Sequence, residues 1–135
     1  MAAPSVELLR KIPLFAELDA RELERLGGSF KERTFDAGSH VVDEGKTGAG
    51  FFVIESGEAS VSVRGDERDK LGPGDYFGEI ALLRDVPRTA TVKATADTEL
   101  LALERDDFLA AVTGHAASAE AAEAVVGARL GVSPV

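Results

Sequence analysis

Two residues of opposite charge, Glu79 and Arg88, lie on either side of the turn at Pro87. Glu79 follows Gly78 in the segment Gly-Glu-Ile-Ala-Leu-Leu, which predicts one or two turns of helix. The first amides of a helix have no acceptor within it and its dipole favours negative charge, so a phosphate can bind there without a lysine. Gly78 leaves room for close approach of a ligand. The pattern predicts a small anion-binding site.

Arg88 and Glu79 suit different parts of one ligand. The guanidinium of Arg88 is a planar, permanently charged fork, and one charge-assisted hydrogen bond to an anion contributes about 1.5 to 3 kcal/mol. An ionised Glu79 only accepts hydrogen bonds and repels an anion, so it requires hydroxyl donors or the arginine itself. Taken singly, Arg88 is typical of a solvated cation at a strand end, and Glu79 of an acid at a helix N-terminus.

Helices are expected at both ends of the chain. Asp19 and Glu22 have capping-box spacing before Leu23 and Leu26, and an earlier apolar segment, residues 5–12, ends at Pro13. We therefore expect two short N-terminal helices. Towards the other end, Asp106 or Asp107 is a candidate cap for a helix over residues 108–112, and an alanine-rich helical stretch runs from Ala116 to Leu130.

Between the helices, from about Phe30 to Leu103, the pattern changes to short strands separated by glycine turns. Ala59, Val61 and Val63 alternate with polar residues, and the same period of two returns at Ala90, Val92 and Ala94. Closely spaced strands of this kind indicate a sandwich or roll. We expect one domain over residues 1–135: a helical part (1–30), a β-roll (31–104) containing the site segment 77–92, and C-terminal helices (105–135).

Composition narrows the function. The 135 residues carry a formal net charge of −9, which opposes direct binding to nucleic acid because such binding needs a clustered basic face. No apolar run reaches the length of a membrane span, and a secretory signal is absent from the first residues. With no cysteine in the sequence, disulfide and thiolate chemistry are excluded, and we expect a cytoplasmic location.

The segment from Phe77 to Val92 resembles the phosphate-binding cassette of cyclic-nucleotide-binding domains, as found in the catabolite activator protein and the cyclic-nucleotide-dependent protein kinases. The resemblance covers residues 8–112, and its joined pattern of glycine, glutamate, a small apolar turn, proline and Arg-x-Ala-x-Val is specific. It implies a mainly β fold of the α+β class, a jelly-roll-like β-roll or double-stranded β-helix with N-terminal helices, an internal cassette helix and C-terminal helices.

The same resemblance implies roles for particular residues. Glu79 would accept the ribose 2′-hydroxyl, Arg88 would pair with the cyclic phosphate, and the amides of Ala81 and Thr89 would complete the anion cradle. Gly78 and Ile80 belong to the same ligand-binding segment. The Thr89 hydroxyl can meet the guanine amino group of cGMP, but it is compatible with cAMP too, so the choice stays open with a lean towards cAMP or dual binding.

The base has fewer obvious contacts. Tyr76, Phe77 and Leu130 are candidates to line it. Family members usually close the pocket with a residue of a C-terminal helix, often aromatic, yet no aromatic residue follows Phe108. Aliphatic candidates for that lid are Val125, Val126 and Leu130; otherwise the lid comes from a partner or from sequence beyond residue 135.

We expect a non-enzymatic sensor that binds cAMP or cGMP, needs no further cofactor or metal, and passes occupancy through its C-terminal helices to an unidentified partner or output domain. Oligomeric state is open. One alternative is a β-roll interaction module that has lost its ligand; it would lack the glutamate or the arginine, and both are present. A cupin-like enzyme is the other, and it would need a metal or acid–base cluster that the two histidines, His40 and His115, do not supply.

Two short motifs have simpler interpretations. Gly45-Lys46-Thr47 is similar to the end of a phosphate-binding P-loop, but His40 stands where that motif needs its first glycine, and no strand-to-helix context follows. Arg64-Gly65-Asp66 predicts a hairpin turn.

Overall fold

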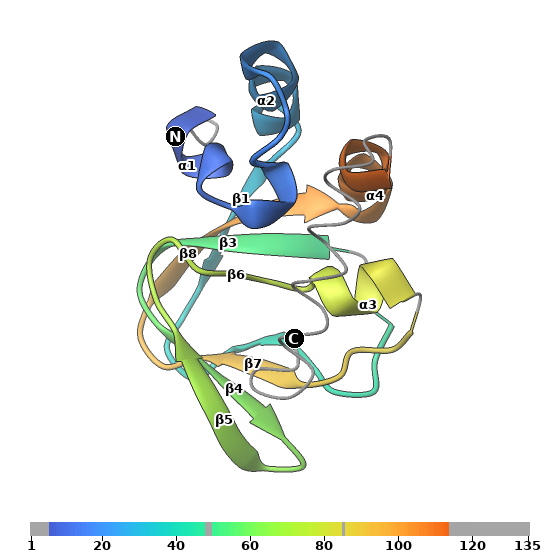
Figure 1. Ribbon diagram of the computed structural model, residues 1–135. Coiled ribbons are helices and arrows are strands. Elements are labelled where there is room, and N and C mark those ends of the chain that lie inside the picture. Colours follow the sequence, from blue (N-terminus) through green and yellow to red (C-terminus); the bar gives the residue numbers. More distant parts are fainter. Residues whose placement is uncertain (1–5, 48–49, 85, 114–135) are drawn as a thin grey trace.

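The computed structural model describes residues 6–47, 50–84 and 86–113, and it consists mainly of antiparallel strands with helices at both ends (Figure 1). The N-terminal helices are α1 (Val6–Arg10), the 3-10 turn η1 (Pro13–Phe15) and α2 (Ala20–Gly27). The strands are β1 (Lys31–Phe35), β2 (His40–Val42), β3 (Gly50–Ser56), β4 (Ala59–Val63), β5 (Asp66–Leu71), β6 (Tyr76–Phe77), β7 (Thr91–Ala94) and β8 (Thr98–Glu104). Helix α3 (Glu79–Arg84) follows β6, and α4 (Arg105–Thr113) follows β8.

The capping box predicted at the start of α2 is present. Asp19 Oδ1 accepts a hydrogen bond from the Glu22 amide at 2.8 Å, and Glu22 Oε1 accepts one from the Asp19 amide at 3.3 Å. The preceding segment differs from expectation, because α1 ends at Arg10 and Pro13 begins a separate 3-10 turn. Ile12, which precedes that proline, is extended with φ −83° and ψ 119°, as the bulk of a proline ring requires of its neighbour.

The strands form two four-stranded sheets, with the order β1-β8-β3-β6 in the first and β2-β7-β4-β5 in the second. The predicted alternation in β4 and β7 is confirmed: Val61 lies opposite Val92 and both are fully buried, whereas Ser60 and Lys93, also opposite each other, lie on the other face. The hairpin predicted at residues 64–66 also forms. Arg64 (φ 53°) and Gly65 (φ 85°) both have the positive φ that a tight turn between twisted strands requires.

The first sheet is buried on both faces. Phe51 and Val53 of β3 pack against the helices, together with Leu101 of β8, while Ile54 and Leu100 face the second sheet. Figure 1 shows this order of layers, with α1, α2 and α4 on one side of β3 and β8 and the second sheet on the other.

Aromatic rings join the helices to the first sheet. The Phe51 ring stacks on Phe108 of α4 with centroids 4.9 Å apart and meets the edge of Phe15 of η1 at 5.6 Å.

The expected cap of α4 is wrong by one or two residues, because the helix begins at Arg105 and places Asp106 and Asp107 inside its first turn. Acidic side chains at that position favour the helix dipole.

Candidate ligand-binding site

Helix α3 begins immediately after β6, and Gly78 makes this junction possible. Gly78 has a φ of 103°, a conformation that residues with a side chain rarely adopt. A Cβ atom at this position would lie only 2.7 Å from the carbonyl oxygen of Gly50 in β3. Glycine therefore allows α3 to start directly against the backbone of β3.

The side chain of Arg88 crosses the space between these two glycines. Only 5% of the residue is exposed. Its Nη2 atom donates a hydrogen bond to the Gly50 carbonyl oxygen at 2.8 Å, and its Nη1 atom donates one to the Gly78 carbonyl oxygen at 3.2 Å. The guanidinium carbon also lies 5.9 Å from the centre of the Phe52 ring, a favourable position for a cation over an aromatic face. The fork is thus held in one orientation.

Burial places a free-energy cost on the Arg88 charge. The pKa of Arg88 is lowered by desolvation, and the negative charge of Glu79 acts in the opposite direction. The Nε atom of Arg88 is buried and has no hydrogen-bond partner among the described residues. A buried guanidinium with donor capacity left over is suited to receive an anion.

Glu79 is the second buried charge of the site, with no exposed surface at all. It is the first residue of α3, where a carboxylate is stabilised by the positive end of the helix dipole and by its electrostatic interaction with Arg88. Charged side chains are seldom buried without a partner of opposite charge. The pair Glu79 and Arg88 therefore marks this end of the roll as a candidate functional site.

Two spaces meet at Arg88. A narrow gap of about 10 Å³ is lined by the predicted site residues Phe77, Gly78, Ala81, Arg88 and Thr89, together with Val42 and Ala90. Beside it lies a larger hollow of about 340 Å³, whose lining includes Val42, Lys46, Gly50, Phe52 and Arg88. The structure thus brings together most of the predicted site residues.

Other predicted residues lie elsewhere. Glu79 and Ile80 are buried and line neither space. Tyr76 packs its ring against Phe51 on the helix side of the first sheet, with centroids 5.7 Å apart. Leu130, Val125, Val126, His115 and the segment 116–130 lie outside the described residues. Sequence reasoning missed Val42, Lys46, Gly50 and Phe52, whose signal is weak because they come from β2, β3 and the loop between them.

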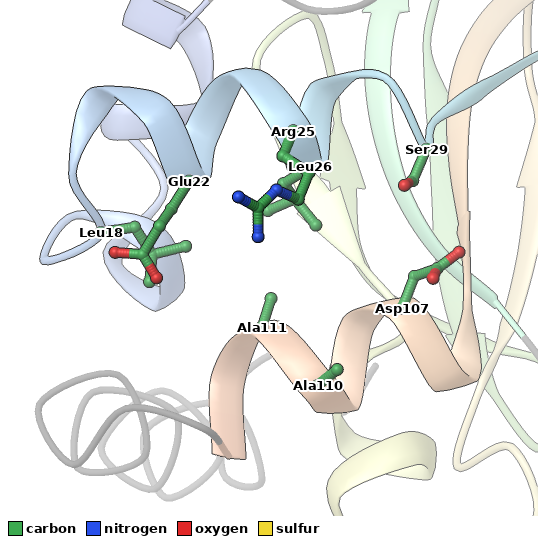
Figure 2. Close-up of a pocket in the computed structure, with 8 residues that line it drawn as sticks. All are labelled: Leu18, Glu22, Arg25, Leu26, Ser29, Asp107, Ala110 and Ala111. Atoms are coloured by element: carbon green, nitrogen blue, oxygen red, sulfur yellow. The ribbon is translucent and has the colours of Figure 1, made fainter.

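A further cavity of about 330 Å³ lies between α2 and α4, on the helical side of the first sheet. Figure 2 shows the Arg25 side chain extending from α2 into the space that Ala110 and Ala111 of α4 face. Glu22, which also lines this cavity, already uses its carboxylate in the capping box of α2. Arg25 is exposed, so this cavity lacks the buried charges that distinguish the site at Arg88.

Comparison with known proteins decides the family. The family model described as the cyclic nucleotide-binding domain matches residues 32–115, which include the whole Glu79–Arg88 site. The chain belongs to the cyclic nucleotide-binding domain family. The β-roll predicted from the sequence is confirmed, with its N-terminal helices, its internal helix α3 and at least one C-terminal helix, α4.

Relatives of this cyclic nucleotide-binding domain include the cAMP-dependent protein kinase regulatory subunit of Yarrowia lipolytica, 37% identical over 102 residues. That match covers 74% of this chain but only 27% of the relative, so the domain spans about a quarter of the length of that protein. The regulatory domain of Toxoplasma gondii PKA, solved with cAMP, is 36% identical with a TM-score of 0.75, covering 81% of this chain and 43% of that one.

A third similar protein was solved with a different molecule. The regulatory subunit of a cAMP-independent protein kinase A from Trypanosoma cruzi, solved with guanosine, is 28% identical with a TM-score of 0.77, covering 81% of this chain and 39% of that one.

Within the described ranges, no helix is long and apolar enough to cross a membrane. Nor do the described residues contain a group of three or more metal-ligating side chains placed to hold an ion.

Proposed function

We propose that this domain is a non-enzymatic regulatory module that binds a cyclic nucleotide, cAMP or cGMP, at the site formed by Gly78, Glu79, Ala81, Arg88 and Thr89. The observation that carries the proposal is the environment of Arg88, which is buried, oriented by Gly50 and Gly78, and left with an Nε atom that has no partner among the described residues. A cyclic phosphate supplies the anion that such a group lacks. Relatives whose names include cAMP support the same ligand class.

The phosphate would bind where α3 begins. Ala81 is the third residue of α3, so its amide lies in the first turn, where no acceptor within the helix is available. Thr89 lines the same narrow gap as Ala81 and Arg88. Amides of Ala81 and Thr89 directed into this gap, together with the guanidinium, would suit a singly charged phosphodiester.

Glu79 would hold the ribose. Its carboxylate repels a phosphate but accepts hydrogen bonds from hydroxyl groups, and the 2′-hydroxyl of a ribose cyclic phosphate is such a donor. A site with a cation for the phosphate and a buried carboxylate for the sugar distinguishes a ribonucleotide from inorganic phosphate. Desolvation of both charges increases the strength of each contact.

The base would be the least strongly recognised part of the ligand. Phe77 and Thr89 line the gap next to Arg88, and one neutral hydrogen bond from the Thr89 hydroxyl changes the affinity by a factor of about ten at most. We therefore expect cAMP binding or binding of both nucleotides. A lid over the base remains a prediction, because the candidates Val125, Val126 and Leu130 lie outside the described residues.

Binding would be transmitted through α3. A gap of about 10 Å³ holds no more than one water molecule, so we expect a phosphate that enters it to displace α3 relative to the sheets. Leu82 of α3 belongs to the same buried cluster as Phe108 and Val112 of α4. A shift of α3 thus changes the packing of α4, and the ligand drives this change only if it binds one arrangement more tightly than the other.

The output would come from a partner protein or a further domain, which the sequence does not identify; the regulatory role is that of the kinase relatives. A cytoplasmic location also stays a prediction.

Isothermal titration calorimetry with cAMP, cGMP, adenosine and guanosine tests the proposal. We expect saturable binding of cAMP, cGMP or both, and at least about tenfold weaker binding of the nucleosides, because they lack the phosphate that Arg88 would pair with. If neither cyclic nucleotide binds up to millimolar concentration, the proposal is wrong. Tighter binding of guanosine than of cGMP would instead assign the site to nucleosides, as in the T. cruzi protein solved with guanosine.

A further inference from the structure

The loop between β2 and β3 is attached to Arg88 through the main chain. The Gly45 amide donates a hydrogen bond to the Arg88 carbonyl oxygen at 2.8 Å, and the Arg88 amide donates one to the Lys46 carbonyl oxygen at 2.8 Å. The Lys46 amide in turn donates to the Asp43 carbonyl oxygen at 3.2 Å and closes a turn. The backbone of Lys46 is therefore held at a fixed position beside the backbone of Arg88.

Glu44 attaches the same loop to two other elements. Its amide donates a hydrogen bond to Thr91 Oγ1 of β7 at 3.0 Å, and its Oε1 atom accepts one from the Arg64 amide, in the β4–β5 turn, at 2.8 Å. A loop held by four separate hydrogen bonds to residues outside it positions its side chains better than a loop held only at its ends.

Lys46 and Arg88 line the same hollow of about 340 Å³. The Lys46 side chain is exposed and forms no hydrogen bond or ion pair with any residue in the part of the chain that the structure describes. Among the described residues that line this hollow, the one carboxylate belongs to Asp43, and its Oδ1 atom is 2.5 Å from His40 Nδ1 in β2. The lysine thus adds to the hollow a second positive charge, which no ion pair within the described residues compensates.

Two cations on one small hollow repel each other unless an anion lies between them. The molecule as a whole carries excess negative charge, with a formal net charge of −9, so a phosphate that approaches the site is favoured by every positive charge placed close to it. A lysine supplies a mobile point charge with three donors, whereas the fork of Arg88 is already oriented by Gly50 and Gly78.

We propose that Lys46 is a second cationic contact for the ligand's phosphodiester, reaching it through the hollow that it shares with Arg88. This inference rests on the proposed function and adds a further binding residue to it. Because the ammonium group is exposed, water and salt screen its charge. Its contribution to the affinity is therefore largest at low ionic strength and decreases as salt is added.

The proposal is tested by calorimetric titration of cAMP and cGMP into wild type, Lys46→Ala, Lys46→Arg and the control Lys70→Ala. Each titration is done at a low and a high salt concentration, about 20 mM and about 300 mM, because charges are screened over a shorter distance at the higher one. Lys70 is an exposed lysine of β5 and lies on neither space at Arg88. For the nucleotide that binds wild type, we expect Lys46→Ala to lose about fivefold in affinity at low salt and less at high salt. Lys46→Arg should retain most of the affinity.

The outcomes separate the two proposals. If wild type binds and Lys46→Ala binds within about twofold of it at both salt concentrations, Lys46 is not a contact, and the proposed function stands. An equal loss in Lys46→Ala and Lys70→Ala also overturns the inference, because it assigns the effect to the overall field of the molecule. If wild type binds neither nucleotide, both proposals are wrong.

Discussion

Gly78 and Arg88 are in direct contact where α3 begins. The Nη1 atom of Arg88 donates a hydrogen bond to the Gly78 carbonyl oxygen at 3.2 Å, and a Cβ atom on residue 78 would lie 3.0 Å from that same nitrogen. The missing side chain at position 78 thus leaves the space in which the guanidinium lies. Gly78 therefore has two roles: it adopts the positive φ at the start of α3, and its carbonyl oxygen helps to orient the buried guanidinium of Arg88.

The first prediction concerns this glycine. Gly78→Ala is expected to cost about 2 kcal/mol or more in the free energy of unfolding, because it adds backbone strain to close contacts with Gly50 and Arg88. Urea denaturation measures the loss. Gly74→Ala is the matched control, since Gly74 also has a positive φ (89°) but a Cβ atom there would meet no other atom within 4 Å. Equal destabilisation by the two substitutions would show that the contact with Arg88 is unimportant.

The second prediction separates the ribose from the phosphate. Wild type is expected to bind cAMP about tenfold or more tightly than 2′-deoxy-cAMP, because a hydrogen bond to a buried carboxylate contributes about 1.5 to 3 kcal/mol. In Glu79→Gln this preference should shrink to a few-fold, while the phosphate contacts stay in place. Calorimetry with the two ligands measures both ratios. A preference that is the same in wild type and variant would remove Glu79 from the ribose site.

The third prediction concerns the base. Thr89→Ala is expected to lower the affinity for cGMP relative to cAMP by about fivefold, the effect of one neutral hydrogen bond. Thr89→Ser, which retains the hydroxyl, should keep the wild-type ratio. Competition of unlabelled cAMP and cGMP against a fluorescent cyclic nucleotide measures it. A cGMP-to-cAMP ratio that does not change in Thr89→Ala would exclude the hydroxyl from base recognition.

The fourth prediction concerns pH and lies away from the ligand. Burial, with the negative charges of Glu32 and Glu99, raises the pKa of Glu55 in β3. The folded state therefore holds the Glu55 proton more tightly than the unfolded state. This contribution favours folding below the ordinary glutamate pKa, and it is lost as the pH rises through the raised folded-state pKa.

Glutamine does not ionise, so Glu55→Gln does not lose stability in this way as the pH rises. The stability of Glu55→Gln relative to wild type should therefore increase between about pH 4 and pH 7. Urea denaturation at a series of pH values measures the difference. Glu67→Gln, at an exposed position in β5, is the control and should show no such trend. A difference between Glu55→Gln and wild type that does not depend on pH would contradict the raised pKa.

Local chemistry explains what the sequence could predict. The spacing of Asp19 and Glu22 specifies α2, and the alternation around Val61 and Val92 specifies two paired strands, because caps and strand faces depend on near neighbours. Glu79 and Arg88 were recognisable for the same reason, since both lie in one short segment of the chain.

Long-range pairing explains what it could not. Phe51 to Ile54 form an unbroken apolar run because both faces of β3 are buried, so the run does not indicate which side chains face the site. Phe52 and Gly50 therefore carry no sequence signal for their contacts with Arg88, which is 38 residues from Gly50 in the chain. The sequence likewise does not predict that Glu32 and Glu99 lie near Glu55, because these two residues come from the separate strands β1 and β8.

The fifth prediction tests the central claim, that Arg88 binds the ligand's phosphate. Calorimetric titration of cAMP and cGMP into wild type, Arg88→Ala and Arg88→Lys is the direct measurement, with circular dichroism to establish that each variant is folded and Arg68→Ala, at an exposed position in β5, as the control. We expect about a hundredfold loss of affinity in Arg88→Ala, a smaller loss in Arg88→Lys, which keeps the charge, and no change in Arg68→Ala. A folded Arg88→Ala that binds cyclic nucleotide within about threefold of wild type would contradict the account.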